Sequence, residues 1–209
     1  MTDLVEGEVR GTWRCPWPGD DPLYVGYHDH EWGRPEEGDA ALLEKVILEG
    51  FQAGLSWITV LRKREAFRTH FRNFDPEKVA RFGVRQIDRM LADPGVIRHR
   101  GKIESAINNA RRAVDTIEQL GSLAALVWPF APGDGPVPRR LADLPAIRPE
   151  AVALSKELKR QGWTFVGPTT MYAMMQAMGM VNDHLEGCHA RVACERARKV
   201  VRRRYPSAV

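Results

Sequence analysis

The stretch "DAALLEKVILEGFQAGLSWITVLRKREAFRTHF", residues 39–71, decides the fold class. Its apolar residues recur at intervals of three and four, which is the period of an amphipathic helix and not of a strand. The pattern predicts one helix over residues 39–54, from an acidic cap to a glycine, and a second helix over residues 56–71 behind a serine cap. Two helices in immediate succession, without strand signal, indicate an all-α domain.

The helical period continues along most of the remaining chain. Asp75 followed by Pro76 is a favoured helix start, because aspartate caps the first turn and proline fits the first helical position. Further helices are predicted over residues 75–82, 84–92, 101–121, 150–162 and 169–180. The segment 129–149 is rich in proline and glycine, so we predict a long loop there.

Length and composition are those of an ordinary globular protein. The 209 residues are 44% hydrophobic and 28% charged, which allows one large domain or two small ones. No apolar run approaches the roughly 18 residues that span a bilayer, and the N-terminus lacks an apolar signal segment. Three cysteines, an odd number, argue against a disulfide framework. We therefore expect a cytoplasmic monomer without a membrane partner.

The positive charge of the chain is concentrated at its end. The formal net charge is +4, and from Arg191 onward there are seven Lys or Arg against one acid, Glu195. This basic tail, residues 191–209, is either a contact for nucleic acid or a solvated helix end. We expect an N-terminal extension over residues 1–14 and the main domain over residues 15–190.

The stretch "NDHLEGC", residues 182–188, holds a histidine and a cysteine four positions apart, His184 and Cys188. Cys15, followed 13 residues later by His28, could complete a set of two thiolates and two imidazoles. Such a closed set is typical of structural zinc and leaves no position for an activated water. The pairing could also be incidental, since rival ligands lie nearby: His30, His189 and Cys194.

Glu49 lies at the edge of the apolar stripe of its predicted helix, amid an unusual density of aromatic residues. Lys45, four residues earlier, offers a surface ion pair as the simpler interpretation. The alternative is a pocket around Glu49 that stacks a flat, cationic ring between aromatic faces. The candidate aromatic residues, which could equally be core, are Tyr24, Tyr27, Trp32, Phe51 and Trp57.

The stretch "PGVIRHRGK", residues 94–102, connects two predicted helices. A short turn that begins Pro-Gly can point successive backbone N–H groups at a phosphate, and Arg98, Arg100 and Lys102 add positive charge. A plain helix connection with solvated basic residues remains the alternative.

Five blocks taken in order give the chain a family resemblance: "DPLYVGYHDHEWG", "LEGFQAGLSWITVLRKRE", "GVIRHRGKI", "LSKELKRQGWTFVG" and "GMVNDHLEGC". With them the chain resembles the bacterial DNA-3-methyladenine glycosylase I family from Cys15 to Cys188. The resemblance implies the helix–hairpin–helix glycosylase fold, in which two helical subdomains flank a pocket and a structural zinc clasp joins the N- and C-terminal segments.

The resemblance also assigns roles to individual residues. The zinc ligands fall on Cys15, His28, His184 and Cys188, and the base-pocket glutamate falls on Glu49. The pocket aromatics fall on Tyr24, Tyr27, Trp32 and Trp57, and Phe51 is counted with them although relatives often carry Gln there. The DNA-contacting hairpin falls on Gly95, Val96, Ile97, Arg98, Arg100, Gly101 and Lys102.

The activity implied is hydrolytic excision of 3-methyladenine from alkylated double-stranded DNA, which leaves an abasic site without a lyase step. Methylation at N3 gives the base a positive charge and makes it a good leaving group, and the base must leave the stack to be tested. Glu49 would recognise the base or act as a general base. The rival hypotheses are a zinc-stabilised nucleic-acid-binding module without catalysis and, less favoured because of the closed ligand set, a zinc hydrolase.

Overall fold

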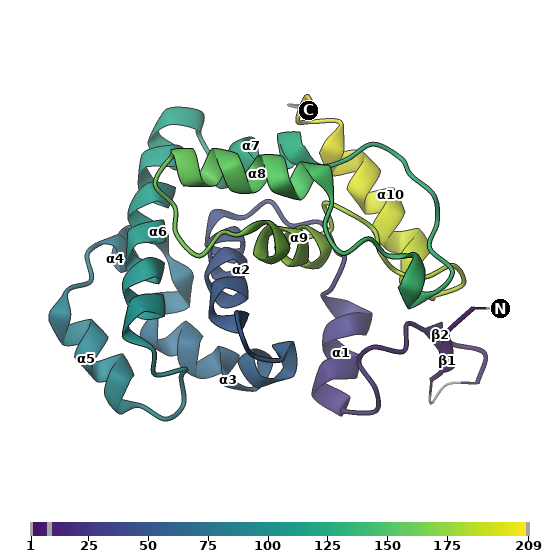
Figure 1. Cartoon of the computed structure of the whole chain (residues 1–209), viewed down its shortest axis with the longest axis horizontal. Helices are drawn as coiled ribbons and strands as arrows, with labels where there is room; N and C mark the ends of the chain where they lie inside the picture. The colour runs from purple at the N-terminus through teal and green to yellow at the C-terminus, as the bar shows by residue number, and fades with distance from the viewer. Residues whose placement is uncertain (1, 8–9, 208–209) are drawn as a thin grey trace.

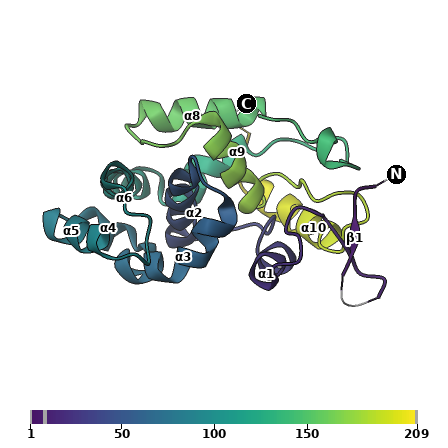
Figure 2. The ribbon, with the colours of Figure 1, turned by 60° about the horizontal axis from the view of Figure 1, so that its bottom comes forward.

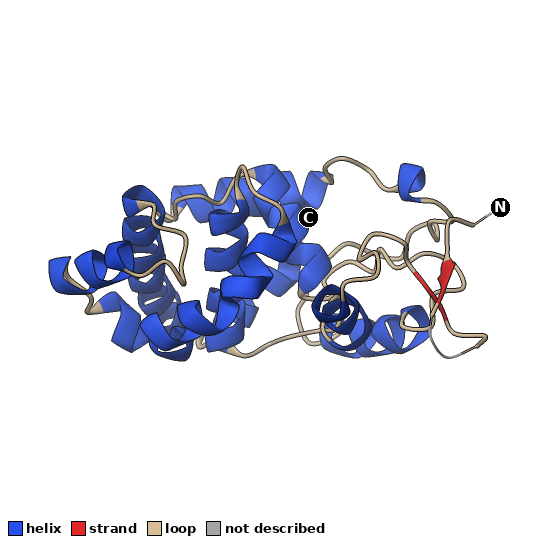
Figure 3. Cartoon of the chain, turned by 90° about the horizontal axis from the view of Figure 1, so that it is seen from below, coloured by secondary structure: helices blue, strands red, loops and turns tan. Residues whose placement is uncertain are grey.

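The computed structural model describes residues 2–7 and 10–207, and it is mostly helical, with long loops at the end where the N-terminus lies (Figures 1 and 3). A two-stranded antiparallel hairpin near the N-terminus pairs Val5–Glu6 (β1) with Trp13–Arg14 (β2). The α-helices span Pro22–His30 (α1), Asp39–Gln52 (α2), Trp57–His70 (α3), Pro76–Ala80 (α4), Val84–Ala92 (α5), Arg100–Leu120 (α6), Leu123–Val127 (α7), Pro149–Arg160 (α8), Pro168–Ala177 (α9) and Arg191–Arg202 (α10). None of the described helices is long and apolar enough to cross a membrane.

Helix α2 lies in the middle of the molecule and packs against α3, α6 and α9 (Figure 1). Helices α4 to α6 lie on one side of it, and α1, α10 and the hairpin lie on the other, with α8 across the top in this view. The turned view keeps α10, α1 and the hairpin together at one end, so segments from both ends of the chain are neighbours (Figure 2). The all-α prediction and its two groups of helices are confirmed.

The predicted helices are present, and their ends follow local chemistry. Helix α1, which the helical period did not predict, begins at Asp21, whose carboxylate accepts the N–H groups of Leu23 and Tyr24 at 3.0 and 3.2 Å. The one-turn break between α2 and α3 contains Gly54, whose φ of 83° lies in the left-handed region that favours glycine. The predicted loop over 129–149 is irregular apart from two 3₁₀ turns, Trp128–Phe130 and Leu141–Asp143.

The predicted basic tail is in large part helix α10, which has a buried face. Cys194, Arg198 and Val201 point inward at helical spacing. Arg198 donates to the Asp134 and Glu195 carboxylates at 3.2 and 2.9 Å. Several of the cations at this end are therefore used to hold α10 against the loop that contains Asp134.

Candidate active site beside a metal-binding cluster

A cavity of about 290 Å³ opens between α1, the end of α2, the start of α3, and α9. Four of the five predicted pocket aromatics line it together with Glu49. The lining residues are Trp17, Tyr24, Tyr27, Trp32, Glu49, Gln52, Trp57, Leu141, Leu144, Ala173 and Gln176. Large aromatic faces with a few polar groups are the usual lining of a site for a flat organic ligand.

The aromatic wall is built chiefly by α1. Tyr24 and Tyr27, three residues apart on one face of α1, stack with an interplanar angle of 28°. Trp57, at the first turn of α3, lies 5.5 Å from the Tyr27 ring centre. Trp17 meets the rings of Tyr24 and Trp32 edge-on, each at 5.0 Å. These ring–ring contacts hold the aromatic wall in place from within the chain.

Among the residues that the structure describes, Glu49 is the only carboxylate that lines the cavity, and it is 5% exposed. Burial raises its pKa to about 7, although the positive charge of Lys45 opposes part of that rise. Of its two oxygens, Oε2 is buried and accepts no hydrogen bond from any residue that the structure describes. A buried acceptor without a partner is costly, which makes this atom a strong candidate for binding a donor on a ligand.

The surface ion pair between Glu49 and Lys45 is excluded, because neither side chain is at the surface. Lys45 is 4% exposed, and its ammonium donates to the Tyr27 hydroxyl at 3.0 Å. Glu49 lines the cavity from the stripe edge that the helical spacing predicted, and Lys45 lies against the rings of Tyr27 and Trp57.

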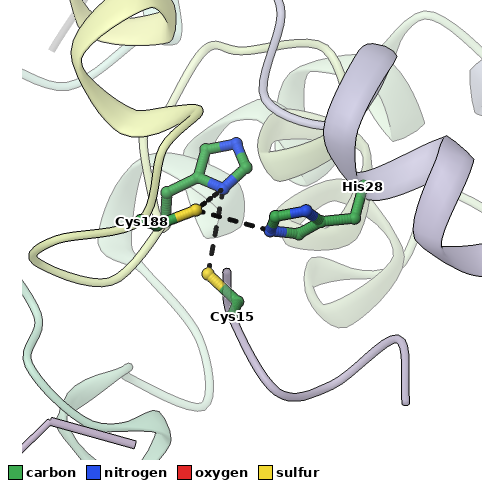
Figure 4. A group of neighbouring side chains, drawn as sticks. Cys15, His28 and Cys188 are labelled. Atoms are coloured by element: carbon green, nitrogen blue, oxygen red, sulfur yellow. Dashed lines mark hydrogen bonds between the residues drawn. The ribbon is translucent and has the colours of Figure 1, made fainter. Parts of the chain in front are cut away.

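Cys15, His28, His184 and Cys188 form one buried cluster, with their candidate ligand atoms within 4.8 Å of one another. Cys188 Sγ lies 3.6 Å from His28 Nε2 and 3.5 Å from His184 Nδ1, and Cys15 Sγ lies 3.8 Å from His184 Nδ1. Tetrahedral zinc with ordinary bond lengths separates a sulfur and a nitrogen ligand by about 3.6 Å. Figure 4 shows Cys15, His28 and Cys188 directed at a common point. The donor set and spacing fit a zinc ion.

Hydrogen bonds outside the cluster orient both imidazoles. His28 Nδ1 is 2.7 Å from Asp29 Oδ1, and His184 Nε2 is 3.1 Å from the Trp32 carbonyl. Each ring thus donates on one side and turns its other nitrogen towards the cluster, the arrangement typical of metal-bound histidine. Although burial raises the pKa of Asp29, hydrogen bonds from Arg14, His28 and His189 hold it well below its usual range.

The rival ligands lie outside the cluster. His189 contacts Asp29 at 3.0 Å and belongs to the outer network instead. Cys194 is buried beside the cluster in the same small apolar group, but it is not one of the four converging residues. His30 lines a surface hollow.

The cluster and the cavity share a wall. Trp17 and Trp32 line the cavity, and the same two rings contact the cluster histidines: Trp17 lies 5.2 Å from the His28 ring and Trp32 lies 4.6 Å from the His184 ring. Helix α1 serves both sites as well, since it carries Tyr27 and His28 in succession. Fixing the cluster therefore fixes the aromatic wall.

Phe51 does not line the cavity, contrary to the expectation that it contacts the base. It is 1% exposed and packs against Phe67 at 4.6 Å and Phe71 at 6.4 Å. The reason is helical geometry, because a residue two positions after Glu49 points to nearly the opposite side of α2. Trp17, Gln52, Gln176, Leu141 and Leu144 do line the cavity and were not predicted. For Trp17, its place in the aromatic-rich segment ahead of α1 was an available signal.

The predicted DNA hairpin forms the turn between α5 and α6. Some of its side chains point into the protein and others point outward. Val96 is buried, and the Gly95 N–H already donates to Asp93 at 2.6 Å. Lys102 is also turned inward: its ammonium donates to the carbonyls of Phe51 at 3.0 Å and Ala53 at 2.7 Å, at the C-terminal end of α2. That position, unlike the predicted phosphate contact, satisfies carbonyls that the helix leaves unpaired.

Arg98 and Arg100 remain on the outer side of the turn. Both are exposed, together with His99 between them. Arg100 pairs with Asp88 at 2.9 Å, while Arg98 has no ion pair within the described part of the chain. Ile97 is half-buried against the core, and Gly101 opens the first turn of α6.

Comparisons with known proteins agree with this architecture. The profile of the methyladenine glycosylase family matches residues 17–191. The chain is 47% identical to DNA-3-methyladenine glycosylase 1 of Escherichia coli K12 over 84% of its own length and 95% of the relative. It is 45% identical to DNA-3-methyladenine glycosylase of Haemophilus influenzae, over 85% of this chain and 97% of the relative.

Solved structures give the same result. A crystal structure of a 3-methyladenine DNA glycosylase I superposes with a TM-score of 0.81 at 47% identity, and the match covers 85% of this chain and 99% of that one. A structure of 3-methyladenine DNA glycosylase I from Staphylococcus aureus, described as the basis of 3-methyladenine recognition, matches with a TM-score of 0.80 at 35% identity over 85% of this chain and 96% of that one.

Proposed function

This chain belongs to the methyladenine glycosylase family, and from that premise we propose that it removes 3-methyladenine from alkylated DNA by hydrolysing the N-glycosidic bond. It is a DNA glycosylase and hence a hydrolase. The observation that supports this substrate is the unpaired Oε2 of Glu49 inside a cavity of about 290 Å³ that is lined by tyrosine and tryptophan.

The cavity suits a flat cation that carries hydrogen-bond donors. The faces of Tyr24 and Trp57 attract positive charge, which alkylated adenine has in DNA and normal adenine lacks. Glu49 accepts from the donor edge of the base, and its carboxylate complements the positive charge. An undamaged adenine would pay for leaving the stack, a few kcal/mol, without gaining this electrostatic term.

Hydrolysis of the N-glycosidic bond needs little from the protein beyond binding of the cationic base. Positive charge on the base weakens the bond between its N9 and C1′ of the sugar, and the bonding electrons leave with the base. A water oxygen then forms the new bond to C1′ and loses its proton. With a pKa raised to about 7, Glu49 is partly ionised at neutral pH, so it can serve base recognition and could also take up that proton.

We assign the four-residue cluster a structural role. Cys15, His28, His184 and Cys188 would hold one Zn²⁺, which supplies cross-linking and no chemistry at the reacting atoms. The residues around it do the positioning, because Trp17 and Trp32 transmit the cluster's rigidity to the cavity wall.

For DNA we propose that a monomer binds the duplex through the turn between α5 and α6. Arg98 is the outward cation of that turn, and backbone N–H groups at the start of α6 add a favourable dipole for phosphate. Lys102 is left out of this contact, since it caps α2.

The test is release of free base from methylated duplex DNA, with 3-methyladenine and 7-methylguanine followed separately. The wild type should release the first and not the second. Glu49→Gln should lower the rate by about 10²–10³, whereas Glu44→Gln, on the same helix but paired with Arg68, should not. DNA binding that weakens with salt, with no base released, would favour the non-catalytic binding module instead.

The Glu49→Gln variant also separates the two roles of the carboxylate. Loss of lesion binding in step with loss of excision assigns Glu49 to recognition. Unchanged binding of lesion DNA without turnover assigns it to proton transfer.

A further inference from the structure

Lys45 is a buried cation directly behind the base cavity, and the proposed reaction gives it no task. Its ammonium lies 4.8 Å from the ring centre of Tyr27 and 4.5 Å from that of Trp57. Both rings line the cavity, whereas Lys45 does not. The ammonium therefore approaches the aromatic wall from the side away from the ligand. A charge placed there would repel a cationic base, so something must balance it.

The acids whose charges act on Lys45 are Glu49, Glu31 and Glu44, and the last two each have another cation as a partner. Glu31 is 3.7 Å from the ammonium, but Arg64 already donates to both Glu31 oxygens at 2.7 and 2.6 Å. Glu44, the neighbouring acid on α2, pairs with Arg68 at 2.9 Å. Glu49 is one helical turn from Lys45 and is buried with it.

The titratable groups that face Glu49 are few. They are Lys45 from α2 and the hydroxyls of Tyr24 and Tyr27 from α1. Of these, only Lys45 carries a positive charge that favours the carboxylate. Burial without this charge would favour the neutral acid, which cannot offer two acceptor oxygens.

We propose that Lys45 is a positioning residue of the base pocket: its buried charge, one helical turn from Glu49, favours the carboxylate form, and its hydrogen bond fixes the Tyr27 ring against which the base stacks. This inference rests on the proposed function for the identity of the ligand. The Lys45 ammonium then lies behind the aromatic wall, while the Glu49 carboxylate, one helical turn away on α2, faces the cationic base. Lys45 itself does not touch the base.

Lys45 thus has two opposite effects: it extends the pH range over which Glu49 is ionised, and its charge lowers the affinity of the pocket for a cationic base. With Lys45, the pocket stays anionic at Glu49 down to a lower pH. Without it, Glu49 takes up a proton at a higher pH, but the bound cation no longer meets a repelling charge behind the wall. Lys45→Met should therefore excise 3-methyladenine much more slowly than the wild type below neutrality, and the difference should narrow well above it, where the loss of the hydrogen bond to Tyr27 is what remains.

The variants are Lys45→Met, which keeps the length of the side chain, and Lys45→Arg, which keeps its charge. Lys156→Met, at an exposed position of α8, is the matched control. We expect the acid limb of the kcat/KM profile to move up by about one pH unit in Lys45→Met, to return towards the wild type in Lys45→Arg, and to stay in place in Lys156→Met. A Lys45→Met profile that coincides with the wild type, or is lower by one factor at every pH, overturns the proposal.

A second measurement separates this proposal from the proposed function. Carbon-13 labelling of glutamate carboxyls, with the Glu49 signal assigned from Glu49→Gln, follows its titration in the free protein. We expect a midpoint about one unit higher in Lys45→Met than in the wild type. If no variant released any base, the function would fail while this titration still tested Lys45. An unchanged midpoint in an active enzyme rejects only the role of Lys45.

Discussion

The metal-binding cluster and the base cavity are neighbours, but they differ in whether their polar atoms have hydrogen-bond partners. In the cluster, both imidazoles have an outer partner, Asp29 or the Trp32 carbonyl, and the Cys15 sulfur accepts the Leu185 N–H at 3.3 Å. In the cavity, Glu49 Oε2 and the indole N–H groups of Trp17 and Trp57 are buried and unpaired within the described chain. A satisfied network stabilises a fold, and an unsatisfied one is held ready for a ligand.

The difference indicates how this small protein can maintain a pocket that lowers its stability. Unpaired buried groups each cost about 1–3 kcal/mol, and the cavity lacks the packing of a filled core. The cluster lies on the other side of the Trp17 and Trp32 rings, and it joins the N-terminal and C-terminal segments of the chain there. Four substitutions test this difference between the cluster and the cavity.

Loss of a cluster ligand should have the largest effect. Cys188→Ser should lower the free energy of unfolding by more than about 4 kcal/mol, because serine does not replace a thiolate on zinc. Chemical denaturation with and without a chelator measures it, and the chelator should destabilise the wild type but not Cys188→Ser. Cys194→Ser, buried beside the cluster, is the control and should cost far less. Equal losses in both variants would remove the cluster from the explanation of stability.

Trp32 tests the shared wall. Trp32→Ala should cost about 3–5 kcal/mol of unfolding free energy and also slow base release, because the same ring lines the cavity and contacts His184. Trp13→Ala, in the hairpin and 44% exposed, should leave both unchanged. A Trp32→Ala protein that loses stability but excises at the normal rate per folded molecule would show that the two sites are independent.

The contribution of Glu49 to the free energy of unfolding should depend on pH. Its folded pKa of about 7 lies above the ordinary 4.5, so the folded state binds the proton more tightly than the unfolded chain. The favourable contribution is complete below pH 4.5 and is lost as pH rises through 7, a change of about 3 kcal/mol. The difference in unfolding free energy between Glu49→Gln and the wild type should therefore grow in favour of the variant from about pH 5 to 8. A difference that is flat with pH would place Glu49 in contact with water.

Asp29 should give the smallest of the four effects. Asp29→Asn keeps the shape but weakens the acceptor for His28 and His189, and we expect a 10- to 100-fold lower zinc affinity, about 1.4–2.7 kcal/mol. Competition with a chromophoric chelator measures it, with Asp20→Asn at an exposed position as the control. Unchanged affinity would mean that Asp29 links chain segments without tuning the metal site.

The sequence predicted the helices well because their apolar residues repeat with the helical period. Helix α1 escaped that signal, since its tyrosines face a cavity and its His28 faces the cluster, so no apolar stripe forms. The Asp21–Pro22 start was nevertheless readable. The placement of Glu49 at a stripe edge is confirmed by its burial, whereas Phe51 packs in the core and does not line the cavity. Helical angles predict this difference, because the two residues are two positions apart.

Other parts of the site depend on packing that no local pattern contains. Gln176 and Leu144 reach the cavity from segments more than 90 positions beyond Glu49 in the chain. Lys102 was interpreted by its charge, but its direction is set by the unpaired carbonyls at the end of α2. The resemblance assigned the four cluster residues, and only the fold brings their atoms together.

The joining of Cys15 to Cys188 has a mechanical consequence. A pulling force applied at the two ends of the chain would pass from one end to the other through the cluster and its neighbour, the hydrogen bond from His189 N–H to the Trp13 carbonyl at 2.8 Å. The helices that carry the cavity would bear no tension until this link ruptured. Single-molecule stretching should then show one long extension with metal bound, and a series of shorter, earlier steps after chelation.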